Sequence, residues 1–283
     1  MQALFILACS ATLVAQNQAA LPDAREIARC SIVTTERNWR ARIQYSYVER
    51  DETRRLGPDG RMQSQDVSVS RINLVNGVPS EDLLEHNGRP PSAEEKAKQK
   101  VKVDKLRRET PEERAARLRK EKQESASLTQ DVLQAFDYRL IGTEPVNGRP
   151  AYVLQAAPRP GYRAESKYGR MIAKVEGRIW VDQRDLVWVK VDGEVIQPFA
   201  MGLFLARVLR GSHITMEQTR VTDGIWLPKQ IEVRANAKVL FIKTLTIDRI
   251  LSYSGYRQVG PALRPGLEPS VSATSSPAGP SRY

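Results

Sequence analysis

Few residues of this chain have the types and spacing that catalysis or metal binding requires. The two histidines, His86 and His213, have no Cys, Asp or Glu near them at ligand spacing, whereas a zinc site normally needs three or four such ligands. No Gly-rich phosphate loop follows a strand, and no Gly-x-Ser-x-Gly elbow is present. A Cys–His nucleophile would have to use Cys30. The sequence therefore predicts no catalytic residue, no metal site and no cofactor.

Carboxylate pairs are the one catalytic arrangement left open, because acid and base carboxylates follow no spacing rule. Asp182 and Asp185 flank a turn, where aspartate usually bonds to the backbone. The enzyme hypothesis is a hydrolase of envelope lipids or glycans, with tryptophans such as Trp188 and Trp226 as binding platforms. It requires two acidic side chains to meet in one cleft.

The elements that would position such residues are mostly strands. The stretch VEGRIWVDQRDLVWVKVDGEV, residues 175–195, alternates apolar and polar residues and turns near residues 183–185, which is typical of a β-hairpin. A strand is predicted to start near Ala41, and a change of phase along the next strand predicts a bulge near Ser70. Further strands are predicted over residues 138–143, 151–157, 214–221, 225–235 and 239–253. Short turns and the lack of βαβ alternation favour an antiparallel sheet in an α+β fold.

Several predicted strands carry apolar side chains on both faces, so one face must pack on a helix, a second sheet or a ligand. Residues 199–209, FAMGLFLARVL, are almost wholly apolar with helical spacing. They predict either a lid helix over an open sheet or a plain core helix. An open apolar face would offer a concave ligand site. The candidate groove residues are Trp180, Val189, Phe199, Leu203, Phe204, Leu227, Ile231, Phe241 and Leu245.

The positive charge is concentrated in one segment. The formal net charge is +11, and twelve Lys or Arg against five Asp or Glu lie between Lys96 and Lys122. Ser92 with Glu95, and Thr110 with Glu113, form two capping-box patterns, so residues 92–126 predict two helices that break before Pro111. We interpret them as a solvated helical insertion. The alternative is a regulatory or interaction role, in which the basic helices dock a membrane surface or an envelope protein. No aromatic residue interleaves with the charges, so nucleic acid is not expected.

Residues 1–20 resemble a secretory signal, with an apolar stretch too short to span a bilayer. They predict export to the periplasm or cell envelope. The alternative is a buried core segment. Within the export interpretation, Ile6-Leu7-Ala8-Cys9 resembles a lipoprotein box, which would place a lipid anchor at Cys9. Between this N-terminal segment and the tail we expect a single domain over residues 24–258, with short helices at 24–38 and 128–136. The tail, residues 259–283, is rich in Pro, Ser and Gly and is predicted to be disordered.

One pattern resembles a known family. A strand, Asn147-Gly148 and a second strand are followed by a strand ending in Trp180-Val-Asp182, a turn, and the strand from Leu186. This is similar to the LolA-like half-barrel superfamily, which includes periplasmic lipoprotein carriers, outer-membrane lipoprotein receptors and the sensor domain of the RseB regulator. The resemblance covers residues 128–256 and, more loosely, 24–90; the family's carriers lack the 92–126 insertion. It implies a curved antiparallel sheet forming an open half-barrel, with helices as lid or plug. It also implies non-catalytic binding of lipid or lipoprotein acyl chains, as a carrier or a sensor.

Overall fold

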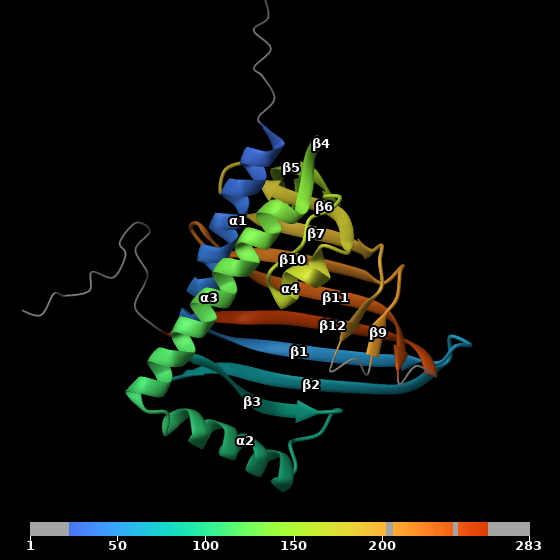
Figure 1. Ribbon diagram of the computed structural model, residues 1–283. Coiled ribbons are helices and arrows are strands. Elements are labelled where there is room, and N and C mark those ends of the chain that lie inside the picture. Colours follow the sequence, from blue (N-terminus) through green and yellow to red (C-terminus); the bar gives the residue numbers. More distant parts are fainter. Residues whose placement is uncertain (1–22, 202–205, 240–242, 260–283) are drawn as a thin grey trace, which may run out of the picture.

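Residues 23–201, 206–239 and 243–259 are described by the structure, a computed structural model. Their strands form one large antiparallel sheet that is not closed into a barrel, with helices packed on one face (Figure 1). The predicted α+β fold with an open half-barrel sheet is thereby confirmed. The predicted signal peptide, Cys9 and residues 260–283 lie outside the described residues. No helix in the described part of the chain is long and apolar enough to cross a membrane.

The sheet has twelve strands, ten of them in the order β3-β2-β1-β12-β11-β10-β7-β6-β5-β4, while the short β9 pairs with both β8 and β11. The strands are β1 Tyr45–Leu56, β2 Met62–Val75, β3 Val78–His86, β4 Phe136–Val146, β5 Arg149–Pro158, β6 Val175–Asp182, β7 Trp188–Val195, β8 Phe199–Met201, β9 Ala206–Val208, β10 His213–Thr222, β11 Ile225–Val239 and β12 Lys243–Gln258. The helices are α1 Ala24–Ala41, α2 Ala93–Arg107, α3 Pro111–Ala135 and α4 Lys167–Ile172, and a 3₁₀ turn, Arg42–Gln44, follows α1.

Local sequence rules account for the hairpin turns and the helix starts. Asn147 and Gly148 both have positive φ, 51° and 77°, as a tight turn that matches the strand twist requires. Ser92 and Thr110 cap α2 and α3, each with the reciprocal glutamate of a capping box. A register shift between Val69 and Ser70 confirms the predicted bulge.

A bulge in the hairpin β6–β7 decides which side chains face the helices. Ile179 lies opposite Val191, but Val181 lies opposite Trp188, so the register shifts between Trp180 and Val181. Directly opposed residues share a face of the sheet. Trp188 and Val191 therefore share the face of Ile179 and Val181, and both pack against the core on that face.

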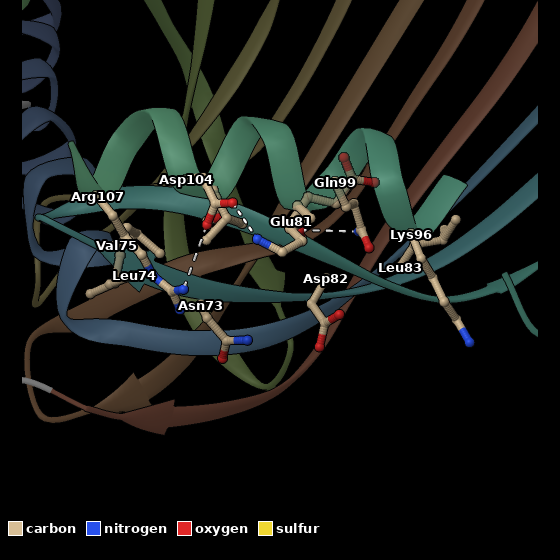
Figure 2. Close-up of a pocket in the computed structure, with 13 residues that line it drawn as sticks. Asn73, Leu74, Val75, Glu81, Asp82, Leu83, Lys96, Gln99, Asp104 and Arg107 are labelled. Atoms are coloured by element: carbon tan, nitrogen blue, oxygen red, sulfur yellow. Dashed lines mark hydrogen bonds and ion pairs between the residues drawn. The ribbon is translucent and has the colours of Figure 1, made fainter. Parts of the chain in front are cut away.

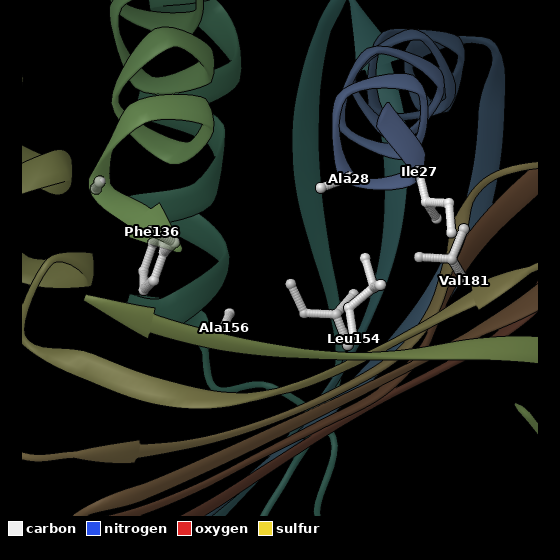
Figure 3. Close-up of a cluster of buried hydrophobic side chains, with 8 residues drawn as sticks. Ile27, Ala28, Phe136, Leu154, Ala156 and Val181 are labelled. Carbon is white, nitrogen blue, oxygen red and sulfur yellow. The ribbon is translucent and has the colours of Figure 1, made fainter. Parts of the chain in front are cut away.

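The core on the helix-side face lies where α1 and the end of α3 cover β4, β5 and β6. Ile27 and Ala28 of α1 pack over Leu154 and Val181 (Figure 3). Leu154 and Val181 have no exposed surface. Apolar burial of this kind contributes about 25 cal/mol per Å², so this contact holds the helices to the sheet.

A second core cluster consists of Ala151, Val153, Trp180, Val187, Val189 and Trp226. Trp180 and Val181 are consecutive in β6, so their side chains point to opposite faces, and this cluster lies on the face away from α1. The indole N–H of Trp180 donates to Glu144 at 2.7 Å, and that of Trp226 donates to Asp185 at 2.8 Å. Both tryptophans thus keep a hydrogen bond while they are buried.

Four sequence predictions about elements were wrong. Residues 199–201 and 206–208, in the segment predicted as a helix, form strands β8 and β9, which pair with each other; β9 also pairs with β11, so sheet pairing overrides helical spacing. The predicted helices 111–126 and 128–136 are one helix, α3. Val239 ends β11 and pairs with Lys243, the first residue of β12, so the predicted strand 239–253 is divided between two paired strands. Residues 41–44 continue α1 and its 3₁₀ turn, and the strand starts at Tyr45. Helix α4 was not predicted.

Replacing Leu154 by alanine should lower the free energy of unfolding by about 2–5 kcal/mol, because it leaves a cavity under α1. Ile141, in the neighbouring strand β4, is 42% exposed and serves as the control. Ile141→Ala should change stability by no more than about 0.5 kcal/mol. Urea unfolding followed by circular dichroism measures both variants, and equal effects would contradict the core assignment.

Candidate functional site

A continuous row of apolar side chains crosses the helix-side face. Ile179 pairs with Val191, and Val191 pairs with Met216 of β10. Met216 pairs with Ile231 of β11, and Ile231 pairs with Leu251 of β12. These five residues, which we call the apolar row, lie side by side on five neighbouring strands. At a strand spacing of about 4.8 Å, the row is about 19 Å long.

The far part of the row is only partly covered. Ile179 is buried at 8% exposure, but Met216, Ile231 and Leu251 are half-buried and belong to neither core cluster. Helix α1, the end of α3 and α4 contribute side chains to the core on β4 to β7, whereas α1 and α3 run along one end of the remaining strands (Figure 1), where α1 also contacts β11. A band of apolar surface therefore remains accessible on β10, β11 and β12.

A second row widens this band. Ile214 pairs with Val233 of β11, and further along the same strands Ala235 pairs with Ile247 and Ala237 with Leu245. Ile214 is 36% exposed. Since these positions are two, four or six residues from the apolar row, they lie on the same face.

At strand β1 the apolar band ends, and polar side chains lie beside it. Asp51 lies opposite Leu251, and Arg249 donates to both carboxylate oxygens of Asp51, at 2.5 Å from Nη2 and 3.0 Å from Nε. Two pairs further along, and so on the same face, Glu49 lies opposite Tyr253. Burial raises the pKa of the Glu49 carboxyl, and the neighbouring Asp51 raises it further. The face thus changes from apolar to polar between β12 and β1.

The structure divides the predicted groove residues among several environments. Ile231 and Leu245 lie on the helix-side face, as a groove requires. Trp180 and Val189 are buried in the cluster on the other face, away from the apolar row; Trp180 alternates with Ile179 along β6, and the bulge in β7 separates Val189 from Val191. Leu227 is fully buried, and Phe199 is a half-buried residue of β8. Leu203, Phe204 and Phe241 lie outside the described residues.

A hollow of about 590 Å³ lies elsewhere, between α2 and strands β2 and β3 (Figure 2). Its polar groups are mostly paired with one another. Asp104 binds Lys100 at 2.5 Å, and the Gln99 amide donates to the Glu81 backbone carbonyl at 3.1 Å. These contacts fasten α2 to the edge strand, so we do not assign a ligand to this hollow.

A histidine cluster joins β2, β3 and α2. His86 Nδ1 lies 2.5 Å from Glu95 Oε1, and His86 Nε2 lies 2.9 Å from Asp66 Oδ1. Hydrogen bonds to Asp66 and Glu95 raise the pKa of His86. Bonds from the backbone and side chain of Ser92, and then from His86, lower the pKa of Glu95 to about 2. Sequence patterns do not indicate this cluster, because the three residues meet only through the pairing of β2 with β3 and the start of α2.

The carboxylates expected of an enzyme are bound to arginines. Arg149 donates to Asp182 at 2.6 Å and to Asp185 at 3.2 Å. Burial favours the neutral form of Asp182, but bonds from Arg149 and the Asp185 N–H outweigh it and lower its pKa. Trp188 donates its indole N–H to Ser31 of α1 at 2.9 Å, and Trp226 is 3% exposed. Neither tryptophan is an open binding platform.

Within the described ranges, no group of three or more His, Cys, Asp or Glu side chains could hold a metal ion.

Comparisons with known proteins give only distant likenesses. No family model matches the sequence, and no curated protein matches it. Among solved structures, it is similar to a DUF1329 family protein from Desulfovibrio piger, with 15% identity over 85% of this chain and 95% of that chain and a TM-score of 0.34. It is also similar to a LolA superfamily protein from Nitrosomonas europaea, with 12% identity, coverage of 83% and 92%, and a TM-score of 0.30.

A third similar structure is an outer membrane lipoprotein-sorting protein domain from Vibrio parahaemolyticus, with 12% identity, coverage of 86% and 95%, and a TM-score of 0.34. The names of the second and third structures agree with the family that the sequence pattern resembles. At these TM-scores the likeness carries no argument about function, and the fold rests on the strand pairing given above.

We expect the attachment of α2 to depend on pH through His86. Its raised pKa means that the stabilisation is fully present below the unfolded-state value of about 6.5 and is lost as the pH rises through the folded-state pKa. The lowered pKa values of Asp66 and Glu95 keep both carboxylates charged in this range. Hydrogen exchange of residues 93–100 should therefore be slower at pH 6 than at pH 8.5, after correction for intrinsic rates.

His86→Gln should remove this pH dependence. The chain has two histidines, so a His213→Gln variant assigns both imidazole signals in a proton NMR titration. A His86 signal that titrates at or below about 6.5 would contradict the proposed ion pairs.

Proposed function

We propose that the protein binds the acyl chains of lipids or lipoproteins on the helix-side face and acts as a carrier or sensor without catalysis. We further propose that it works in the periplasm or cell envelope after export. The observation that supports this best is the apolar row, which continues beyond the helices as partly exposed Met216, Ile231 and Leu251. A large apolar concave surface with a few polar groups at one end is a common form of ligand site.

The dimensions of the row suit a hydrocarbon chain. A chain that buries about ten methylenes gains about 8 kcal/mol at about 0.8 kcal/mol each. The loss of ligand freedom and the ordering of side chains then reduce the net affinity. Hydrophobic contact alone can therefore supply useful binding, with no need for a buried catalytic or metal group.

The polar residues at β1 suit the head of an amphiphile. The apolar row ends beside Asp51 and Arg249, and Tyr253 and Glu49 form the next pair on the same face. An acyl chain lying along the row would place its polar head near these side chains, where hydrogen bonds are available. This arrangement favours a lipid-like ligand over a wholly apolar one.

Leu251→Gln should weaken binding of a fluorescent fatty acid about tenfold, because it places an amide in the apolar row at a cost of about 1–3 kcal/mol. Ile250 is the matched control: it is the preceding residue of β12, is also half-buried, and pairs with Glu52 on the opposite face. Ile250→Gln should leave the affinity unchanged within about twofold.

Both variants are compared with the wild type by fluorescence titration, and native mass spectrometry after gentle extraction tests for a bound lipid. Equal losses in the two variants would contradict binding on the helix-side face. A wild-type protein that takes up no fatty acid and carries no lipid would overturn the proposed function itself.

A further inference from the structure

In helix α2 the acidic side chains all have partners, whereas several of the basic side chains do not. Each of its acidic side chains already has a partner. Glu94 binds Lys98 at 2.6 Å, Asp104 binds Lys100, and Glu95 closes the capping box and contacts His86. The negative charges of the helix are therefore used to hold it together and to fasten it to the sheet.

Three basic residues near the end of α2 lack such partners. Lys102, Lys105 and the C-cap residue Arg108 are exposed, and no described Asp or Glu lies within ion-pair distance of any of them. Their spacing of three residues places them along one side of the helix. Lys98 and Val101 lie on the same side, and Val101 is 69% exposed. We call these five residues the basic face.

The other side of α2 is attached to the sheet. Gln99 donates to the Glu81 carbonyl, and Asn76 donates to the Leu106 carbonyl at 2.6 Å. Val103 lines the hollow between helix and sheet. Because Gln99, Val103 and Leu106 recur at helical spacing on the attached side, the basic face points away from the sheet. Figure 1 shows α2 at the outside of the molecule, beyond β3.

We propose that the basic face binds the surface of an anionic lipid bilayer. Lysine stems can lie along the headgroup layer while the ammonium groups contact lipid phosphates. Val101, in the middle of the charged side, can bury its methyl groups at the boundary with the acyl chains. The face is the outer side of a helix that Gln99 and Asn76 fasten to the sheet, which suits a broad charged surface better than a small ligand.

This proposal goes beyond the acyl-binding function and fails independently of it, because it concerns the empty protein and a different surface. Unpaired charges near an anionic membrane contribute about fivefold each to the binding constant. The three bases without partners should together contribute about a hundredfold. The attraction should weaken strongly when the salt concentration rises from about 0.1 M to about 1 M, because the Debye length falls from about 10 Å to about 3 Å.

The test is co-sedimentation of the full chain with vesicles of phosphatidylglycerol and phosphatidylcholine in equal parts, and with pure phosphatidylcholine vesicles. The variant Lys102→Gln/Lys105→Gln/Arg108→Gln should lose most of the binding to the anionic vesicles. The matched control is Arg163→Gln/Arg178→Gln/Lys238→Gln, which removes the same charge from exposed positions outside α2. It should keep wild-type binding.

A second measurement uses the wild type alone, so it does not depend on how the variants fold. Anionic vesicles should protect Lys102 and Lys105, but not Lys238, from acetylation detected by mass spectrometry. Equal losses in the two triple variants would assign the binding to net charge and overturn the proposal. It is also overturned if neutral vesicles bind equally well, or if Lys102 and Lys105 are not protected.

Discussion

The structure depends on the packing of α1 and the end of α3 against one end of an open sheet. Ile27 and Ala28 cover Leu154 and Val181, and Trp188 adds a hydrogen bond to Ser31 in the same layer. An open sheet of this size has far more apolar surface on its inner face than two helices can cover. The packing therefore divides the face into a closed core over β4 to β7 and a partly open band over β10 to β12.

Hydrogen bonds to buried carboxylates stabilise the closed end. Asp131 of α3 is 1% exposed and accepts bonds from the Tyr162 hydroxyl and from the backbone N–H groups of Glu165 and Ser166. Burial opposes the charge of Asp131, but these bonds outweigh it and lower its pKa. Gly169 must be glycine here, because a Cβ would lie 1.9 Å from a carboxylate oxygen of Asp131. The loop before α4 is thereby tied to α3.

Sequence reasoning succeeded where a rule is local and failed where the outcome depends on strand register. The turn at Asn147-Gly148 and the caps at Ser92 and Thr110 follow from a few adjacent residues, and all three are present. The bulge in β7 has no such local signal. Simple alternation would place Val189 and Val191 on one face, but one extra residue in the strand separates them.

The candidate site shows the same limit. Ile231 and Leu245 are predicted as groove residues because apolar residues recur along single strands, and the structure places both on the helix-side face. The apolar row became visible only when neighbouring strands were aligned, since Val191, Met216 and Leu251 come from distant parts of the sequence. The apolar spacing of residues 199–209 is compatible with a helix, whereas pairing between β8, β9 and β11 stabilises residues 199–201 and 206–208 as strands.

The position of α2 also bears on solubility. An outermost strand such as β3 presents unpaired backbone groups that can template the addition of a strand from another molecule. Helix α2 lies along this border, and the Gln99 side chain donates a hydrogen bond to one of the carbonyl groups of β3. At the opposite border, Pro145 of β4 has no N–H to offer an incoming strand. An unclosed sheet can thus stay dispersed in water while one of its faces remains available.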